Sequence, residues 1–94
     1  HDGELEKLEE ELKIIEHSEE IKSKLFECLK LLEKSEYSVN ANLQIAAKSI
    51  EQISGFSEHY EPLSKRLESS FQELKDIANE MIIAIEKKFK YHKV

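Results

Sequence analysis

Residues 62–91 read PLSKRLESSFQELKDIANEMIIAIEKKFKY, the longest periodic stretch of the chain. Apolar side chains recur in it at intervals of three and four residues, as they do along one face of an α-helix. Pro62 stands in the first turn of this predicted helix, where proline is tolerated. At about 1.5 Å per residue the helix would be about 45 Å long. Its stripe comprises Leu63, Leu67, Leu74, Ile77, Met81 and Ile85, with Phe71, Ala78, Ile82 and Phe89 beside it.

Three shorter segments with helical periodicity come before it, and each would be about 20–26 Å long. They predict helices over about 4–16, 19–34 and 39–54, in addition to the helix over 62–91. The third is expected to bury Val39, Leu43, Ala46, Ile50 and Ile53. Residues 1–94 are therefore predicted to form a single all-α unit, an antiparallel coiled coil or up-down helical bundle of about four helices.

The first segment carries a coiled-coil seam in a strongly acidic context. Its apolar residues are spaced by three, four and three positions, which corresponds to the a and d positions of two heptads. Residues 2–20 hold nine acids and two lysines. The last helix ends in cations, at Lys87, Lys88, Lys90 and Lys93. We therefore expect the helix over 4–16 to pair antiparallel with the second half of the last helix, with both termini at one end.

Local signals mark the ends of the helices. The heptad register breaks at residues 17–18, where Ser18 is a suitable N-cap; this break is either a reversal of the chain or a kink in one continuous helix. Ser38 is predicted to cap the third helix. Gly55 follows the last periodic residue of that helix, where a left-handed cap belongs, and Phe56 could supply the accompanying hydrophobic contact.

Composition supports helices and excludes several classes of protein. Ala, Glu, Lys, Leu and Arg supply 48 of the 94 residues, which is typical of long helices. Two glycines and one proline are too few for the turns of an all-β fold. The net charge of −6 argues against dedicated nucleic-acid binding by this segment, because phosphate binding needs clustered Lys and Arg. No apolar run is long enough for a membrane span, and no signal peptide opens the chain.

The single cysteine, Cys28, cannot form an intrachain disulfide. It lies among leucines, so we expect a small buried hydrophobic residue in a reducing compartment and no reactive thiol. Tyr37 and Tyr60 are expected to pack over turns. The stretch from Lys87 to Lys93 mixes bases with aromatics, as single-strand binders do. A helix C-terminus enriched in cations is the favoured interpretation.

No motif for a reaction is present in the sequence. It contains no phosphate-binding glycine loop, no C-x-x-C and no H-E-x-x-H. None of its histidines follows an acid by three positions, and His17 and His59 fall in predicted turns, which argues against a phosphotransfer histidine. We therefore predict no catalytic, cofactor-binding or metal-binding residue in this chain.

Four stretches together resemble the coiled-coil arm of the RecN family, bacterial DNA repair proteins of the SMC-like ATPases. Residues 3–15, GELEKLEEELKII, look like the acidic end of the family's outgoing arm, and residues 17–21 look like its short helix break. Residues 29–38 are similar to its "ALxLLEG…S" turn, and residues 67–78, LESSFQELKDIA, to its "LESAxxELxDxA" stretch. The resemblance covers about residues 3–80, and the longer loop before Pro62 departs from it.

The resemblance implies a mechanical function. RecN-like proteins join two ATPase halves through an antiparallel arm and act on DNA double-strand breaks ahead of recombination. The chain would be the arm or its tip, with the ATPase heads and their ATP and Mg outside residues 1–94. It would set the length of the arm and offer a surface for self-association or a partner. DNA would be bound through the parent protein, in the cytoplasm of a bacterium and near its nucleoid, and no membrane or small-molecule substrate is expected.

Two other interpretations remain open. The chain could be a helical-bundle interaction module of another family, or another SMC-like hairpin. An enzyme is the least supported, because no catalytic constellation is present. The start at His1 without Met favours a fragment of a longer protein.

Overall fold

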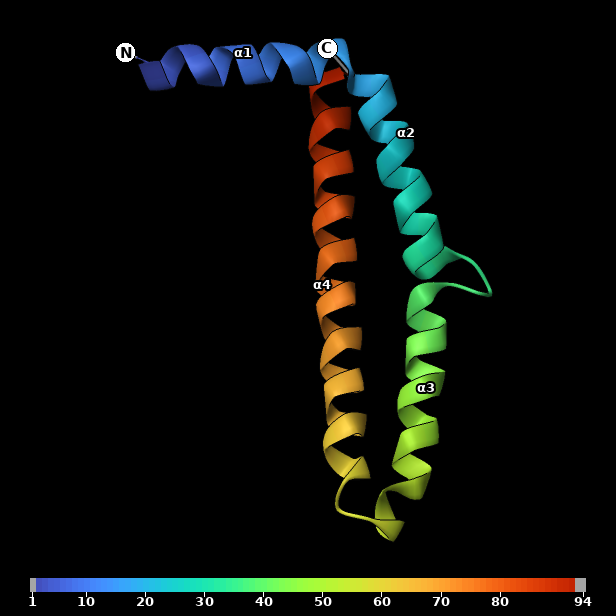
Figure 1. Cartoon of the computed structure of the whole chain (residues 1–94). Coiled ribbons are helices and arrows are strands. Elements are labelled where there is room, and N and C mark those ends of the chain that lie inside the picture. The colour runs from blue at the N-terminus through green and yellow to red at the C-terminus, as the bar shows by residue number, and fades with distance from the viewer. Residues whose placement is uncertain (1, 93–94) are drawn as a thin grey trace.

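The computed structural model describes the backbone of residues 2–92 and the side chains of residues 3–87. Four α-helices and two short helical turns follow one another, and the described residues contain no strand (Figure 1). The elements are α1 (Asp2–Glu16), α2 (Ser18–Leu29), the π-helical turn η1 (Lys30–Lys34), α3 (Val39–Ile53), the 3₁₀ turn η2 (Ser54–Phe56) and α4 (Tyr60–His92). The all-α prediction is confirmed, and the helices lie where the apolar periodicity predicts them.

Most of the molecule is a long helical hairpin. One side of the hairpin is α4 alone, and the other is α2 followed by α3; the chain reverses once between α3 and α4 (Figure 1). The molecule measures 59 × 34 × 16 Å, and its radius of gyration is 19.1 Å. A compact domain of this length would have a radius of about 12 Å. The hairpin is thus only two helices thick, and much apolar surface stays exposed.

Small residues let α3 and α4 approach closely. Ala47 on α3 is buried, and the buried Ser64 on α4 donates a hydrogen bond from Oγ to the carbonyl oxygen of Ala47, at 3.3 Å. A short serine side chain can donate a hydrogen bond to the backbone of a neighbouring helix only if the axes of the two helices lie close together. This contact lies close to the tip of the hairpin and aligns the two helices there.

The apolar core lies between α2 and α4. Leu29, Ala78 and Ile85 form a buried cluster, and Leu25 and Ile82 pack against it. Ala78 is fully buried. Its methyl group leaves room for the larger Leu and Ile side chains around it, so α2 can lie close to α4 as a knobs-into-holes pair does.

The buried face of α3 differs by one position from the predicted stripe. Val39 and Ala46 are exposed, whereas Asn40 and Ala47 are buried. One residue of an α-helix corresponds to a rotation of about 100°, so neighbouring positions compete for the same side of the interface. The prediction for Val39 and Ala46 was therefore wrong, because in each case the next residue along the helix, Asn40 or Ala47, takes the buried side.

The junction between α2 and α3 is a capped turn. The side chain of Ser38 accepts a hydrogen bond from the backbone N–H of Ala41 at 3.1 Å, which confirms the predicted N-cap. On the other side of the turn the last residues of α2 widen into η1, and the N–H of Ser35 donates to the carbonyl of Lys30 at 3.2 Å. Tyr37, expected to pack over this turn, is 80% exposed.

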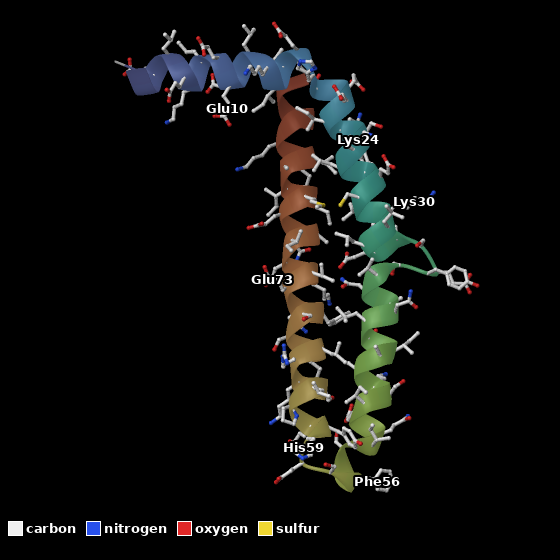
Figure 2. The ribbon with its side chains drawn as sticks, viewed as in Figure 1. Glu10, Lys24, Lys30, Phe56, His59 and Glu73 are labelled. Atoms are coloured by element: carbon white, nitrogen blue, oxygen red, sulfur yellow. The ribbon has the colours of Figure 1, made fainter. Side chains whose placement is uncertain are left out.

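The tip of the hairpin differs from its prediction. Gly55 does not take up a left-handed conformation, because no described glycine has a positive φ. The chain instead tightens into η2, and Phe56 points away from the helices with 84% of its surface exposed (Figure 2). A 3₁₀ turn satisfies the last helical carbonyls by shorter-range bonds, so a left-handed cap is not needed. Pro62 lies in the first turn of α4, as predicted.

The four-helix bundle is not confirmed, because α1 leaves the hairpin. The backbone bond from His17 N–H to the Lys13 carbonyl (3.0 Å) is the last of α1, and the bond from Ile21 N–H to the His17 carbonyl (2.9 Å) is the first of α2. The break at residues 17–18 is a sharp bend between two helices and not a reversal (Figure 1). Ser18 is the first residue of α2, and no side-chain cap precedes it. As a result α1 extends away from the hairpin at a steep angle to α4, instead of packing along it (Figure 1).

Prediction for the α3–α4 contact. Ala47→Leu should lower the free energy of unfolding by about 1–3 kcal/mol, because three added heavy atoms would crowd the buried contact between Ala47 and α4. The measurement is urea unfolding followed by far-UV circular dichroism.

The neighbouring variant Ala46→Leu is the control, since Ala46 is exposed on the same helix. It should change stability by less than about 0.5 kcal/mol. Equal effects of the two variants would show that the buried face of α3 is misassigned.

Candidate interaction surface

The described residues show their most distinctive features on the surface. Among them no group of three His, Cys, Asp or Glu side chains could hold a metal ion. No helix of this part of the chain is long and apolar enough to cross a membrane. The features that stand out are apolar surfaces, and two of them meet at the junction of α1 and α2.

The first is an apolar stripe on α1 that nothing covers. We call it the α1 seam; it consists of Leu5, Leu8, Leu12 and Ile15. These four side chains are between 56% and 65% exposed. The predicted heptad is thus present as a helix, but its a and d positions have no partner among the described residues. A helix of a folded protein normally buries such a stripe.

Every position that flanks the α1 seam is a glutamate. With Leu5 and Leu12 at a and Leu8 and Ile15 at d, the flanking e and g positions are Glu4, Glu9, Glu11 and Glu16. All four are exposed. The two lysines of α1 lie at outer positions of the heptad. In coiled coils the e and g charges select the partner, so the seam carries a specific charge pattern as well as apolar surface.

The second feature is an open groove in the bend between α1, α2 and α4, which we call the elbow groove. Its volume is about 640 Å³. Its floor is apolar and includes Ile14, Ile21, Leu25, Cys28 and Met81. Polar side chains of α1 and α2 line its edges, and Glu10 lies on the side of α1 nearest to α4 (Figure 2).

Cys28 lies in this groove and not in the closed core. It is half-buried, as a free thiol. The prediction of a small buried residue is met only in part, because the side chain is half-buried. The hydrophobic periodicity did not show that these surroundings stay open, because the bend at His17 removes α1 from the place where it would close them.

His17 and His59 both lie outside helix interiors, as predicted. His17 stands at the kink, and its Nδ1 lies 3.4 Å from a carboxylate oxygen of Glu20 one turn further on. Both side chains are well exposed. His59 lies in the turn at the tip (Figure 2). The imidazole of His17 thus has one exposed carboxylate partner, and His59 is exposed at the tip. The basic stretch after Lys87 lies outside the described side chains.

One polar pair in the hairpin could not be predicted from the sequence. Asn40 is 5% exposed, and its Nδ2 donates to Oε1 of Glu33 at 3.1 Å. The Oδ1 of Asn40 is buried and has no hydrogen-bond partner. The pair joins η1 to the start of α3 and therefore fixes how α2 meets α3. The apolar stripe of α3 runs from Val39 without a break, so the sequence carries no signal for this pair.

Comparison of the chain with protein-family models, curated proteins and solved structures finds no match.

Prediction for the Asn40–Glu33 pair. Asn40→Asp should lower the free energy of unfolding by about 2–3 kcal/mol at neutral pH, because a carboxylate buried beside the half-buried Glu33 replaces the donor. Repulsion raises the folded-state pKa of the new carboxyl above its unfolded value. The loss of stability is therefore present at neutral pH and should diminish as the pH falls through the folded-state pKa. The measurement is thermal unfolding at a series of pH values.

Asn42→Asp is the matched control. Asn42 is exposed on the same helix, and its Nδ2 donates to the backbone carbonyl of Tyr37 at 3.4 Å. This variant should lose much less stability and show little pH dependence. Similar profiles for the two variants would contradict the assigned contact.

Proposed function

We propose that the chain is a structural coiled-coil segment of an SMC-like, RecN-like protein of DNA double-strand-break repair and recombination. In this role it sets the length of an arm and offers a surface for self-association or a partner. The supporting observation is the hairpin itself. The helix α4, which has 33 residues, lies along the two consecutive helices α2 and α3. The chain reverses at the tip between α3 and α4, so the other ends of α2 and α4 lie together at the opposite end of the hairpin. An antiparallel arm requires this topology.

The proposal assigns no reaction to residues 1–94. The parent protein would be an ATPase, with ATP and Mg bound in heads outside this segment. It would bind DNA through those other parts, in the cytoplasm and near the nucleoid of a bacterium. The apolar contacts between α2 and α4 support a mechanical role, since they hold the two sides of the hairpin together.

The coding sequence on either side of this segment tests the repair assignment. A strand, a GxxxxGK[ST] loop and a helix should be encoded ahead of residue 1, and the second half of an ABC-type ATPase should follow residue 94. Start and stop signals close to both ends would overturn the assignment and leave a free-standing helical protein.

A second candidate is a helical interaction module of another family. The exposed α1 seam favours it, because a helix that protrudes with its apolar stripe uncovered is a common way to bind another helix. The same flanking sequence separates the two candidates. Under either candidate function the hairpin serves as a scaffold, and α1 is the element that contacts a partner.

Prediction for the hairpin in solution. Spin labels at positions 24 and 83, in a Cys28→Ser background, should lie close together, because Leu25 and Ile82 pack against one cluster. Labels at 24 and 65 should be much farther apart, since position 65 lies about 27 Å from position 83 along α4, at 1.5 Å per residue. Double electron–electron resonance measures both pairs. Similar distances for the two pairs would exclude the arm topology.

A further inference from the structure

The two faces of α1 have opposite surroundings. Residues Glu10, Lys13, Ile14 and His17 line the elbow groove. At about 100° per residue, these positions lie on the opposite side of the helix from the α1 seam. The polar side of α1 therefore faces the hairpin, and its leucines face away from it. The hairpin cannot cover the seam without a rotation of α1 about its own axis.

The glutamates beside the seam disfavour pairing of α1 with the α1 of a second copy. In a parallel pair the g position of one helix meets the following e position of the other, which places Glu4 against Glu9 and Glu11 against Glu16. In an antiparallel pair e meets e and g meets g, and each contact is again between glutamates. Both arrangements bring like charges together at every flanking position.

We propose that the α1 seam is the docking site for a basic amphipathic helix of another polypeptide, with aliphatic a and d positions and Lys or Arg at e and g. Charge complementarity specifies this occupant: a partner with cations at all flanking positions turns each repulsive contact into an attractive one. The inference rests on the proposed role of α1 as an interaction element and is independent of the link to DNA repair.

The length of α1 gives the partner a second effect. An isolated helix of 15 residues is only marginally stable in water. A basic partner helix would bury the four seam side chains and stabilise α1. Binding should therefore be accompanied by a gain in helical signal that arises from residues 2–16.

The test uses the whole chain and a synthetic three-heptad peptide, with Ile at a, Leu at d and Lys at e and g. Fluorescence anisotropy of the labelled peptide measures binding at low and high salt, and circular dichroism measures helix content. We expect saturable binding that weakens about tenfold as the ionic strength rises, because the flanking pairs are exposed. The same peptide with Glu at e and g should not bind.

Two double variants of equal charge locate the site. Glu9→Lys with Glu11→Lys reverses charges beside the seam and should weaken binding about tenfold. Glu6→Lys with Glu10→Lys makes the same change of net charge at outer positions of α1 and should change binding less than about threefold. Leu8→Ser with Leu12→Ser should abolish binding and leave the thermal unfolding of the hairpin unchanged.

Three outcomes would overturn the proposal. They are equal binding of the Lys and Glu peptides, equal effects of the two charge-reversal variants, and dimerisation of the chain through the seam without peptide. Analytical ultracentrifugation of the unaltered chain and of the Leu8→Ser, Leu12→Ser double variant detects the third outcome. A dimer that only the unaltered chain forms would assign the seam to a second copy. A failure here leaves the arm topology standing, since the spin-label distances between α2 and α4 report on the hairpin separately.

Discussion

The rest of the structure depends on the close approach of α4 to the two helices opposite it. Ala78 is fully buried against Leu29, and Ala47 lies near enough to α4 for its carbonyl to accept a bond from Ser64. Small residues at both contacts allow short interhelical distances, at which the larger neighbours interdigitate. In a molecule two helices thick, no third layer can compensate for a gap. The separation set by these alanines therefore determines whether the longer side chains reach one another at all.

One helix spans the hairpin, and its partner is interrupted. The interruption at residues 35–38 removes helical hydrogen bonds, and the structure replaces them with local ones: the cap from Ser38 and the pair between Asn40 and Glu33. Both Ser38 and Asn40 are buried, so these polar contacts belong to the interface and not to its rim. Because α4 is continuous across this point, α2 and α3 pack one after the other along it. The joint is thus held by its own polar pair and by the continuous helix opposite.

Apolar periodicity predicted the helices of this chain, because a spacing of three and four residues is a direct consequence of helical geometry. It did not predict which of two neighbours is buried. Val39 and Asn40, or Ala46 and Ala47, differ by one step around the helix, and packing against α4 decides between them. The cap at Ser38 was predictable because it is local. The 3₁₀ turn at Gly55 and the open elbow groove were not, since both depend on where the next element goes.

The direction of α1, like the 3₁₀ turn and the groove, depends on tertiary contacts that the local sequence does not specify. The sequence indicates a seam, a run of glutamates and a register break, and all three are present. Pairing with the basic end of α4 would have satisfied the charges, but the chain bends at His17 without reversing, and one backbone bond ends α1 there while another begins α2. The bend leaves the α1 seam facing away from the hairpin, so a partner can bind there without displacing any contact of α2 or α4. Because the hairpin of α2, α3 and α4 is packed and the α1 seam beyond the bend is exposed, the chain can bind a helix while the hairpin remains folded.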